Sequence, residues 1–346
     1  MNLNSVYFFI LLILLLFAVT ENILTYRSKS KNIIFLILVI VFICFCASRP
    51  LDFDKDIQMY QAYFLEFCNY SYSDILFNNT HRIREKGYIL INKFFCSFGF
   101  RELIIFFAIL GISVKSYLLQ KESKLPITAF FIYVALFLPL REYTQIRDAT
   151  ATSFLFFALF LYQKRKFYLS IFVFLIAFSF HAVALIYLPV IFFLSILKKE
   201  IHYVYLLLFG YLLFLLQSLK WVVTLPFLPD QLLRYNSFEG RGSVLILLFA
   251  VLIIALYHYA KALGKIDSDS KLNFYAKITY IGLFFGLVTF DHPVLSRLSN
   301  ALVFFAIILL TETIVVLKNS YSKYVFSLIL IIIYYFGMRN FVLINY

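Results

Sequence analysis

The stretch IIFLILVIVFICF, residues 33–45, contains no charged side chain. With its neighbours it predicts a helix over 32–48, about the length that crosses the hydrocarbon core of a bilayer. Working outward, Lys29 and Lys31 precede this run and Arg49 follows it. This predicted span thus has lysines at one end and an arginine at the other, and the rest of the chain repeats this pattern.

Composition places the whole chain in the membrane. Its 346 residues are 63% hydrophobic, 21% aromatic and only 14% charged, with a mean hydropathy of +0.90. Runs such as Val6–Leu16 and Ala301–Leu310 resemble the first. We therefore expect an all-α polytopic membrane protein, a single transmembrane domain over 1–346 with no room for a sizeable soluble domain. The first apolar stretch lacks a basic start and a small-residue cleavage site, which predicts a retained helix.

About twelve transmembrane helices follow from the hydropathy pattern. They are expected near 5–25, 32–48, 102–120, 125–140, 144–162, 167–179, 182–197, 202–218, 243–261, 273–290, 294–317 and 323–338. The short loops rich in lysine then fall on one side, which the positive-inside rule makes cytoplasmic. Both termini are expected outside the cytoplasm. The net charge of +13 belongs largely to these loops, so no nucleic-acid partner is expected.

The two kinds of cation separate across this predicted map. Only four of the nineteen lysines fall outside: Lys55, Lys86, Lys93 and Lys220. Ten of the twelve arginines fall there: Arg49, Arg82, Arg84, Arg101, Arg141, Arg147, Arg234, Arg241, Arg297 and Arg339. Arginine grips phosphate with a rigid fork, whereas lysine is a point charge. The asymmetry indicates an anion handled on the outer face, and a phosphate-bearing lipid is the natural candidate.

Two segments depart from simple spans. Residues 49–101 form a long outer segment in which Ile57, Tyr60, Phe64 and Phe67 share one face of a predicted interfacial helix. Residues 167–197 lie between two basic loops, so the chain must enter and return in two limbs of about 14–16 residues, roughly 21–24 Å. That is less than the about 30 Å of hydrocarbon, and predicts a short re-entrant-like hairpin with His181 recessed at its tip. A second outer loop is expected over 219–242.

Neither cysteines nor metal ligands dominate the pattern. Cys44 and Cys46 lie in an apolar run, and Cys68 and Cys96 are expected to be free thiols, although they could meet on the outer face. We expect no cofactor and no metal. The acidic run Asp52, Asp54 and Asp56 is the one place where a divalent ion could find oxygen ligands.

Several outer polar residues have a structural explanation as well as a functional one. Asp54 suits the N-cap of the interfacial helix, and Asp291 before Pro293 is typical of an N-cap followed by the first helical residue. The string Arg82–Lys86 could be a solvated charge run, and Arg147 could pair with an outer carboxylate. Asp56 and Tyr60 stand four apart on one helix face, which directs a carboxylate and a phenol to the same place.

Taken in order, these features resemble the Wzy/EpsG family of bacterial polysaccharide polymerases. The matching elements are Asp56-x3-Tyr60-x3-Phe64, Glu85-x-Gly87-Tyr88, Ile146-Arg147 with Ala151, His181 before Leu185, and the late Arg297. The resemblance covers nearly the whole chain, and order, spacing and shared sidedness make it specific. Asp148 departs from the glutamine that is more usual after this arginine.

The resemblance implies a GT-C-like enzyme of the bacterial inner membrane that polymerises repeat units of O-antigen, capsule or exopolysaccharide. Its partners would be an undecaprenyl-pyrophosphate-linked glycan donor and acceptor, membrane lipids, and a chain-length regulator as a further candidate. A breaking glycosyl–pyrophosphate bond needs a cation, and the acceptor hydroxyl needs a base. The expected catalytic residues are Asp56, Glu85, His181 and Arg147. The expected pyrophosphate- or sugar-binding residues are Arg49, Asp52, Asp54, Tyr60, Arg141, Arg234, Arg241 and Arg297.

Other functions fit part of the pattern. A flippase or transporter for the same lipid-linked sugar would also want an arginine cavity, but it should carry charges through its spans and internal pseudo-symmetry. Glu21 and Glu312 instead lie near predicted cytoplasmic helix ends. An O-antigen ligase would share the use of arginine with a different acceptor, whereas a membrane acyltransferase needs no outer arginine set.

Overall fold

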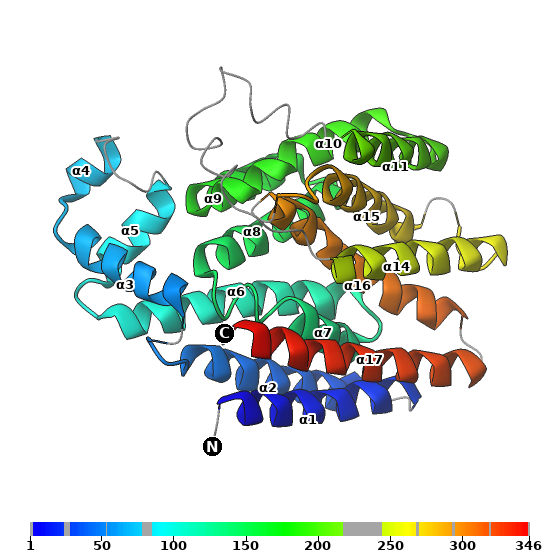
Figure 1. The fold of residues 1–346 in the computed structure, drawn as a ribbon, viewed down its shortest axis with the longest axis horizontal. Coiled ribbons are helices and arrows are strands. Elements are labelled where there is room, and N and C mark those ends of the chain that lie inside the picture. The colour runs from blue at the N-terminus through cyan, green and yellow to red at the C-terminus, as the bar shows by residue number, and fades with distance from the viewer. Residues whose placement is uncertain are drawn as a thin grey trace. The chain divides into compact units, whose positions relative to one another are not determined.

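The structure is a computed structural model that describes residues 3–23, 28–52, 54–77, 85–216, 244–267, 270–292, 295–317 and 320–344 (Figure 1). Regular structure in these ranges is helical and includes no strand, which confirms the all-α membrane class. Among the described residues, six helices are long and apolar enough to cross a membrane: α1 (Leu3–Ile23), α2 (Ser28–Ala47), α6 (Phe100–Glu122), α14 (Val244–Ala262), α16 (Ser296–Leu317) and α17 (Ser320–Ile344). Each of the twelve expected ranges overlaps a helix of the structure, but only some of these helices are long enough to cross a membrane.

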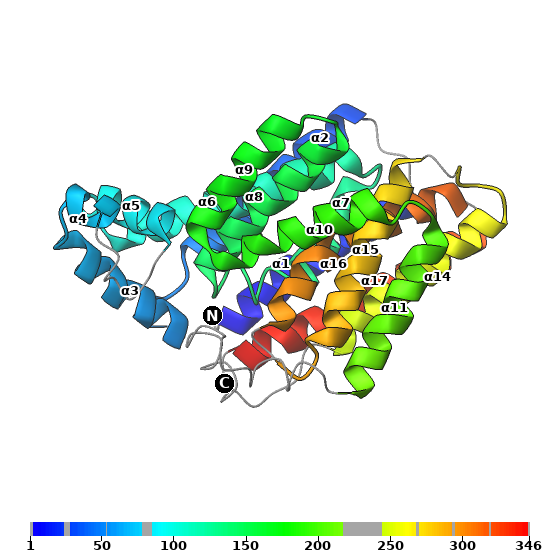
Figure 2. The same cartoon turned by 90° about the horizontal axis from the view of Figure 1, so that it is seen from above.

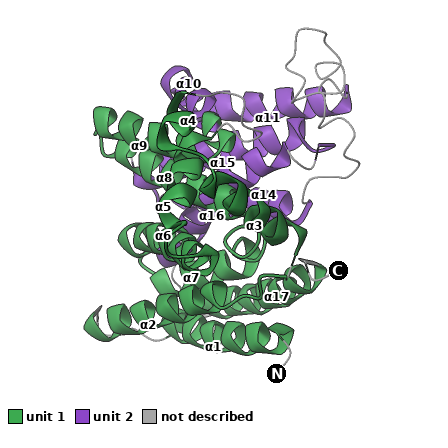
Figure 3. Ribbon diagram, turned by 90° about the vertical axis from the view of Figure 1, so that its left-hand side faces the viewer, with its two compact units in different colours: residues 1–185, 320–346 green, residues 186–319 purple. Residues whose placement is uncertain are grey.

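Shorter helices make up the rest of the fold. Four apolar ones are α7 (Pro126–Leu136), α9 (Phe167–Phe180), α10 (Tyr187–Ile196) and α11 (Glu200–Leu215). Two more helices are α8 (Ile146–Gln163) and α15 (Lys271–Val288), and three lie between α2 and α6: α3 (Lys55–Cys68), α4 (Tyr72–Phe77) and α5 (Lys86–Phe95). The chain divides into two compact units, residues 1–185 with 320–346 and residues 186–319 (Figure 3).

In the first unit, α1 and α17 run antiparallel. Tyr7 stacks on Phe341 with ring centroids 4.1 Å apart, and at the other end Asn22 donates to the carbonyl oxygen of Lys323 at 2.9 Å. The chain therefore enters α1 and leaves α17 at the same end of this unit, as both figures of the fold indicate (Figures 1 and 2). That the termini share one side agrees with the predicted topology; that this side is extracytoplasmic stays a prediction.

Lysines and arginines gather at opposite ends of the first unit. At what we call the lysine end, Lys31 donates to the carbonyl oxygen of Lys124 at 3.0 Å, and Lys164 pairs with Glu122 at 3.1 Å. Glu21 also lies there, where its carboxylate accepts the backbone N–H of Thr128 at 2.8 Å and so caps the first turn of α7. The arginine end comprises Arg49, Arg101, Arg141 and Arg147, at the other tips of the same helices.

Helix α7 ends before the predicted boundary. The sequence predicts a helix to residue 140, but α7 stops at Leu136 and residues 137–144 are turns. Pro139 explains the early end, because a proline cannot donate to the helix ladder and disfavours helical backbone in the residue before it. Most of this irregular segment is buried, which is how non-helical backbone persists at the edge of a membrane bundle.

The segment between α2 and α6 carries α3, α4 and α5 beyond the ends of both helices (Figures 1 and 2). Asp54 caps α3, accepting the backbone N–H of Ile57 at 2.8 Å as predicted for an N-cap. The apolar face predicted to enter the membrane interface packs on protein instead. Phe64 lies 5.5 Å from the ring of Phe100 at the start of α6, and Phe67 contacts Tyr88 of α5. The sequence pattern therefore predicted the apolar face of α3 correctly, but this face contacts α5 and α6 and not the membrane interface.

Helix α9 ends at Phe180, and His181 has extended backbone with φ −163°. A short 3-10 helix, Ala182–Ile186, follows it and leads into α10. The break falls where the sequence predicts the tip of the hairpin, and the two limbs have 14 and 10 residues. They belong to different units, and the return of the chain to the same membrane face stays a prediction.

The second unit is built around α16, in which every residue of 301–310 is buried. Helix α15 packs against α16 and α11, where Gly210 lets α11 approach Phe284 closely. Lys271 of α15 pairs with Glu312 of α16 at 3.5 Å. Glu312 thus has a local partner, as Glu21 has in the first unit.

Candidate active site at the arginine end of the first unit

Arg147 is the second residue of α8 and lies between two tyrosine rings. Its guanidinium carbon is 5.7 Å from the ring centroid of Tyr60 and 5.4 Å from that of Tyr88. One terminal nitrogen of Arg147 is 3.5 Å from a carboxylate oxygen of Glu85. The side chains of Arg147 and Glu85 are 16% and 20% exposed, so both remain accessible from outside the protein. This is a long ion pair that involves a single contact, not a bidentate clamp.

Three elements far apart in sequence build this cluster, which we call the Arg147 site: Tyr60, Glu85, Tyr88 and Arg147. Tyr60 comes from the buried face of α3, Tyr88 from α5, and Glu85 is the residue that precedes α5. The two rings meet edge to face with centroids 6.2 Å apart. Aromatic rings attract a guanidinium by cation–π interaction, and Tyr60 in addition accepts a hydrogen bond from Arg147. The Nε of Arg147 is buried and has no acceptor among the described residues.

Gly87 is what lets α5 reach this position. A Cβ atom at residue 87 would lie 2.2 Å from the Oγ of Ser179 and 3.0 Å from its backbone oxygen, so any side chain would push α5 away from α9. The spacing Glu85-x-Gly87-Tyr88 therefore places an acid and an aromatic ring on either side of a close helix contact. The same contact brings the Arg147 site next to the end of α9, where His181 lies.

His181 and Asp56 border the same region. The Nδ1 of His181 accepts the backbone N–H of Val183 at 3.1 Å. With Nδ1 engaged as an acceptor, Nε2 is the nitrogen left to carry the proton of a neutral imidazole. Asp56 lies one turn before Tyr60 on α3 and is half-buried. The catalytic roles predicted for these two residues stay predictions.

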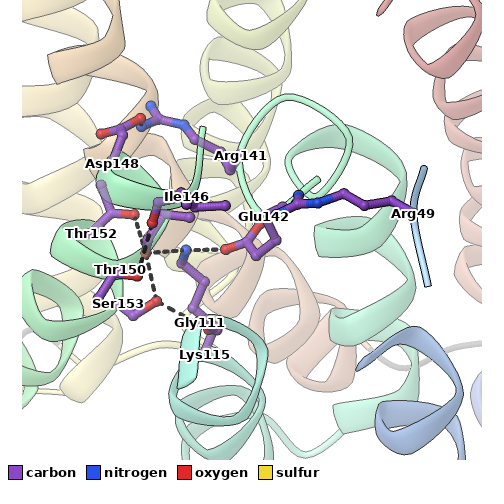
Figure 4. A network of polar contacts seen from close by, with 11 residues as sticks. Arg49, Gly111, Lys115, Arg141, Glu142, Ile146, Asp148, Thr150, Thr152 and Ser153 are labelled. Atoms are coloured by element: carbon purple, nitrogen blue, oxygen red, sulfur yellow. Dashed lines mark hydrogen bonds and ion pairs between the residues drawn. The ribbon is translucent and has the colours of Figure 1, made fainter. Parts of the chain in front are cut away.

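Arg141, only six residues before Arg147, lies in a different environment (Figure 4). It forms a buried ion pair with Asp148, and their side chains are 7% and 3% exposed. Next to it, Lys115 of α6 pairs with Glu142, with exposures of 3% and 0%, and donates to the carbonyl oxygen of Ala149 at 3.0 Å. We call these four residues, with Arg49, the buried ion network.

Arg49 belongs to the network through the backbone. It is fully buried, and it donates to the carbonyl oxygen of Glu142 at 2.9 Å and to that of Tyr143. Its own carbonyl oxygen accepts from Arg101 at 2.6 Å. Arg49 therefore ties the end of α2 to the irregular segment before α8. The substrate contacts predicted for Arg49 and Arg141 stay predictions, and in this structure both arginines are engaged within the protein.

The other predicted site residues are spread more widely. Asp54 caps α3, and Asp52 is exposed, with its carbonyl oxygen 3.5 Å from the side-chain nitrogen of Gln58. Arg297 is half-buried in the first turn of α16, in the second unit. Arg234 and Arg241 lie outside the described residues, as do Arg82 and Arg84.

Two important residues were not in the predicted set of site residues. Tyr88 appeared only as part of a motif, yet it forms one wall around Arg147. Lys115 lies in the middle of a membrane-length helix and was passed over, although a lysine in an apolar span is itself a signal for a buried partner or a functional site.

The cysteine prediction was wrong. Cys68 and Cys96 form a disulfide, with Cα atoms 5.6 Å apart, while Cys44 and Cys46 are free. A pairing across 28 residues depends on how α3 and α5 pack, which cysteine spacing alone does not specify.

Within the described ranges, no three His, Cys, Asp or Glu side chains converge as metal ligands would. Of the acidic run, Asp54 directs a carboxylate oxygen at the backbone of α3, and Asp52 faces outward. Metal independence stays a prediction, to be tested with a chelator.

Comparison with known proteins places the chain at the level of a family. No curated protein and no solved structure matches it. The match to a protein family covers residues 32–346, and so includes all three elements of the Arg147 site, the buried ion network, the second unit and the first unit from residue 32 onward. On this match, which spans most of its length and bears out the resemblance seen in its motifs, the chain belongs to the EpsG family.

Proposed function

We propose that the protein polymerises undecaprenyl-pyrophosphate-linked oligosaccharide units by metal-independent glycosyl transfer at the arginine end of the first unit. Membership of the EpsG family suggests a polysaccharide polymerase type of function. Membrane-length helices agree with a lipid-linked substrate. In this proposal the arginine end, with both termini, faces away from the cytoplasm of a bacterial inner membrane, and the lysine end lies in the cytoplasm.

The observation that carries the proposal is the state of Arg147. Each other arginine–acid pair or lysine–acid pair described at this end is buried and closed, whereas Arg147 is partly exposed and contacts its carboxylate through one long interaction. The rings of Tyr60 and Tyr88 hold the guanidinium by cation–π contact, and Tyr60 also accepts a hydrogen bond from it, while the buried Nε has no acceptor among the described residues. An arginine held in place but not consumed by a partner is suited to bind an incoming pyrophosphate in bidentate fashion.

The reaction assigns distinct tasks to the residues of the site. A hydroxyl of the acceptor sugar attacks the anomeric carbon of the donor, and the bond from that carbon to the pyrophosphate oxygen breaks. The pyrophosphate leaves with the bonding electrons, and Arg147 neutralises the charge that develops on it. A carboxylate takes the proton of the attacking hydroxyl, and Glu85 is the acid nearest to Arg147.

The contact between Glu85 and Arg147 then has a consequence for timing. Before the donor binds, Glu85 partly neutralises the charge of Arg147. The pyrophosphate carries more charge and can accept from the guanidinium through two oxygens, so it displaces Glu85 from Arg147. Glu85 becomes free to accept a proton only once the donor is in place. Coupling the base to donor binding would limit wasteful hydrolysis of the lipid-linked glycan.

The decisive experiment compares two arginines in purified protein reconstituted in vesicles with lipid-linked repeat units. Arg147→Lys keeps the charge but removes the fork, and should lower the polymerisation rate by about 10²–10³. Arg339→Lys is the matched control, because Arg339 is exposed on α17, and it should polymerise at the rate of the wild type. The assay runs in excess EDTA; rates that collapse there and return with magnesium would refute metal independence.

The products separate this function from its alternatives. Elongated chains on the lipid carrier indicate a polymerase. Transfer of units to a different lipid acceptor without elongation would indicate a ligase, and movement of intact units across the bilayer would indicate a flippase. Full-length polymer from Arg147→Lys would reject the role given to Arg147.

A further inference from the structure

The disulfide lies on the same two helices that enclose Arg147. Cys68 is the last residue of α3, which carries Tyr60, and Cys96 follows α5, which carries Tyr88. Beside the disulfide, Lys93 of α5 donates to the carbonyl oxygen of Cys68 at 2.8 Å. The helices that provide the two walls of the Arg147 site are thus joined covalently at their C-terminal ends.

The spacing makes the connection direct. Cys68 follows Tyr60 by eight residues, and Cys96 follows Tyr88 by eight residues. Eight residues of helix rise about 12 Å, so each helix carries its tyrosine about 12 Å from its cysteine. The ring contact of Tyr60 with Tyr88 and the disulfide are two contacts between the same pair of helices, two turns apart.

Besides the disulfide, α3 and α5 make few contacts with each other, although both also pack on α6 and α5 packs on α9. Helix α3 has 14 residues and α5 has 10, lengths at which an isolated helix is marginal in water. The shared apolar contacts are few, chiefly those of Phe67 and Tyr60 with Tyr88. Small helical elements with a limited core are those that a disulfide stabilises most usefully.

We propose that the Cys68–Cys96 disulfide is a positioning crosslink that sets the gap between Tyr60 and Tyr88 around Arg147, and that it forms outside the cytoplasm. Its effect on turnover rests on the proposed function, which also places this end outside the cytoplasm; its existence does not. Formation oxidises the two thiols, which lose two protons and two electrons. The oxidant is the disulfide of an exported thiol–disulfide exchange protein, which is reduced to a dithiol.

A first test requires no enzyme assay. In a Cys44→Ser, Cys46→Ser background the pair at 68 and 96 provides the only thiols, since the chain has four cysteines. Intact cells are treated with a membrane-impermeant phosphine reductant and then with an impermeant maleimide–polyethylene glycol. We expect a gel shift of two labels only after reduction. Two labels without reduction, or no label after reduction until the membrane is opened, would overturn the crosslink or its compartment respectively.

The second test measures positioning. The same background protein, folded and oxidised in vesicles, is assayed before reduction, after reduction, and after reoxidation. We expect kcat/KM to fall by about 10-fold on reduction, mainly through the donor KM, and to recover on reoxidation, because a loosened site binds pyrophosphate less well. Hydrogen exchange should accelerate in α3 and α5 and stay unchanged in α6 and α8.

The outcomes are distinguishable. If the oxidised protein does not polymerise, the proposed function fails while the labelling result still reports on the crosslink. Faster exchange in α3 and α5 with unchanged kinetic constants would reject positioning, because the disulfide would then stabilise the helices without affecting the site. A Cys68→Ser, Cys96→Ser variant should match the reduced protein in KM, and wild-type constants for it would also reject the proposal.

Discussion

Two groups of charges lie within a few residues of each other at the arginine end, and they differ in how their ion pairs are closed. In the buried ion network, Arg141 and Lys115 have their acids in direct contact and almost no exposure. In the Arg147 site the pair is longer and about a fifth exposed. A charge that is completely paired stabilises an arrangement; a charge that is held in place and incompletely paired can bind something else. The network therefore shapes the irregular segment before α8, and that segment sets the position of Arg147.

The largest expected effect comes from opening the network. Lys115→Met leaves the carboxylate of Glu142 buried without its cation, and breaking such a pair typically costs about 3–5 kcal/mol. We expect the variant to accumulate poorly in the membrane and to unfold at a much lower temperature. The measurement is membrane level together with thermal unfolding in detergent.

Two matched variants sharpen this result. Lys115→Met combined with Glu142→Leu replaces both charges by apolar groups, and should recover most of the stability. Lys121→Met, at the exposed far end of α6, should change little. A single Lys115→Met variant as stable as the wild type would mean that the network is not a structural support, and would place Lys115 among the functional candidates.

The second prediction addresses the Arg147 site. Glu85→Gln keeps the shape of the side chain and removes its charge. Pyrophosphate then no longer competes with a carboxylate for Arg147, and the reaction loses its base. We expect kcat to fall by about 100-fold while inorganic pyrophosphate inhibits more strongly than in the wild type. The measurements are steady-state rates and the pyrophosphate inhibition constant.

Glu102→Gln is the control for that experiment, because Glu102 is exposed in the first turn of α6 at the same end. An unchanged kcat in Glu85→Gln would transfer the role of base to another acid, with Asp56 the nearest candidate on α3. Weaker inhibition by pyrophosphate would mean that Glu85 supports donor binding instead of competing with it.

These contrasts also explain how far the sequence could lead. Apolar runs predicted a polytopic helical protein, and the motifs pointed to Glu85, Tyr60 and Arg147, which the structure brings together. A single sequence could not reveal which arginine would have its charge buried and fully paired. Arg141 and Arg147 are equivalent by residue type and by position at a span entrance, and only packing decides that one meets Asp148 and the other two rings.

The same limit applies to α3 and to the cysteines. A helix with one apolar face must bury it, and periodicity cannot say whether the partner is lipid or protein. The sequence thus predicted the face of α3 correctly and assigned it to the membrane interface, while α5 and α6 cover it. The disulfide followed from that same packing, and was missed for the same reason.

A smaller effect is expected from the contact between α5 and α9. Gly87→Ala places a methyl group against Ser179 and should shift α5, at a cost of about 1–3 kcal/mol for a close contact that must relax. Activity should fall because Tyr88 and Glu85 move with α5. Adding Ser179→Gly removes the side-chain part of the clash and should restore part of the activity, whereas Ser195→Gly, on the exposed surface of α10, should restore none. Wild-type activity in Gly87→Ala would show that the approach of α5 to α9 is not what positions the site.

The smallest expected effect concerns Asp54. A role as the N-cap of α3 and a role in binding substrate predict different results for its variants. Burial raises the pKa of Asp54, in spite of the hydrogen bond from Ile57 that lowers it. Because the folded pKa lies above the unfolded value, the folded state holds more protons in that window, and stability falls as the pH rises through it. Asp54→Asn keeps the cap and removes the buried charge, so above this window it should be as stable as the wild type or slightly more stable. Asp54→Ala loses the cap, worth about 1 kcal/mol, and should be less stable than Asp54→Asn at every pH, because neither variant titrates at residue 54. Thermal unfolding from acidic to neutral pH measures both. If Asp54→Asn is stable and yet inactive, Asp54 contacts the substrate in addition to capping α3, and the Arg147 site extends to the start of that helix.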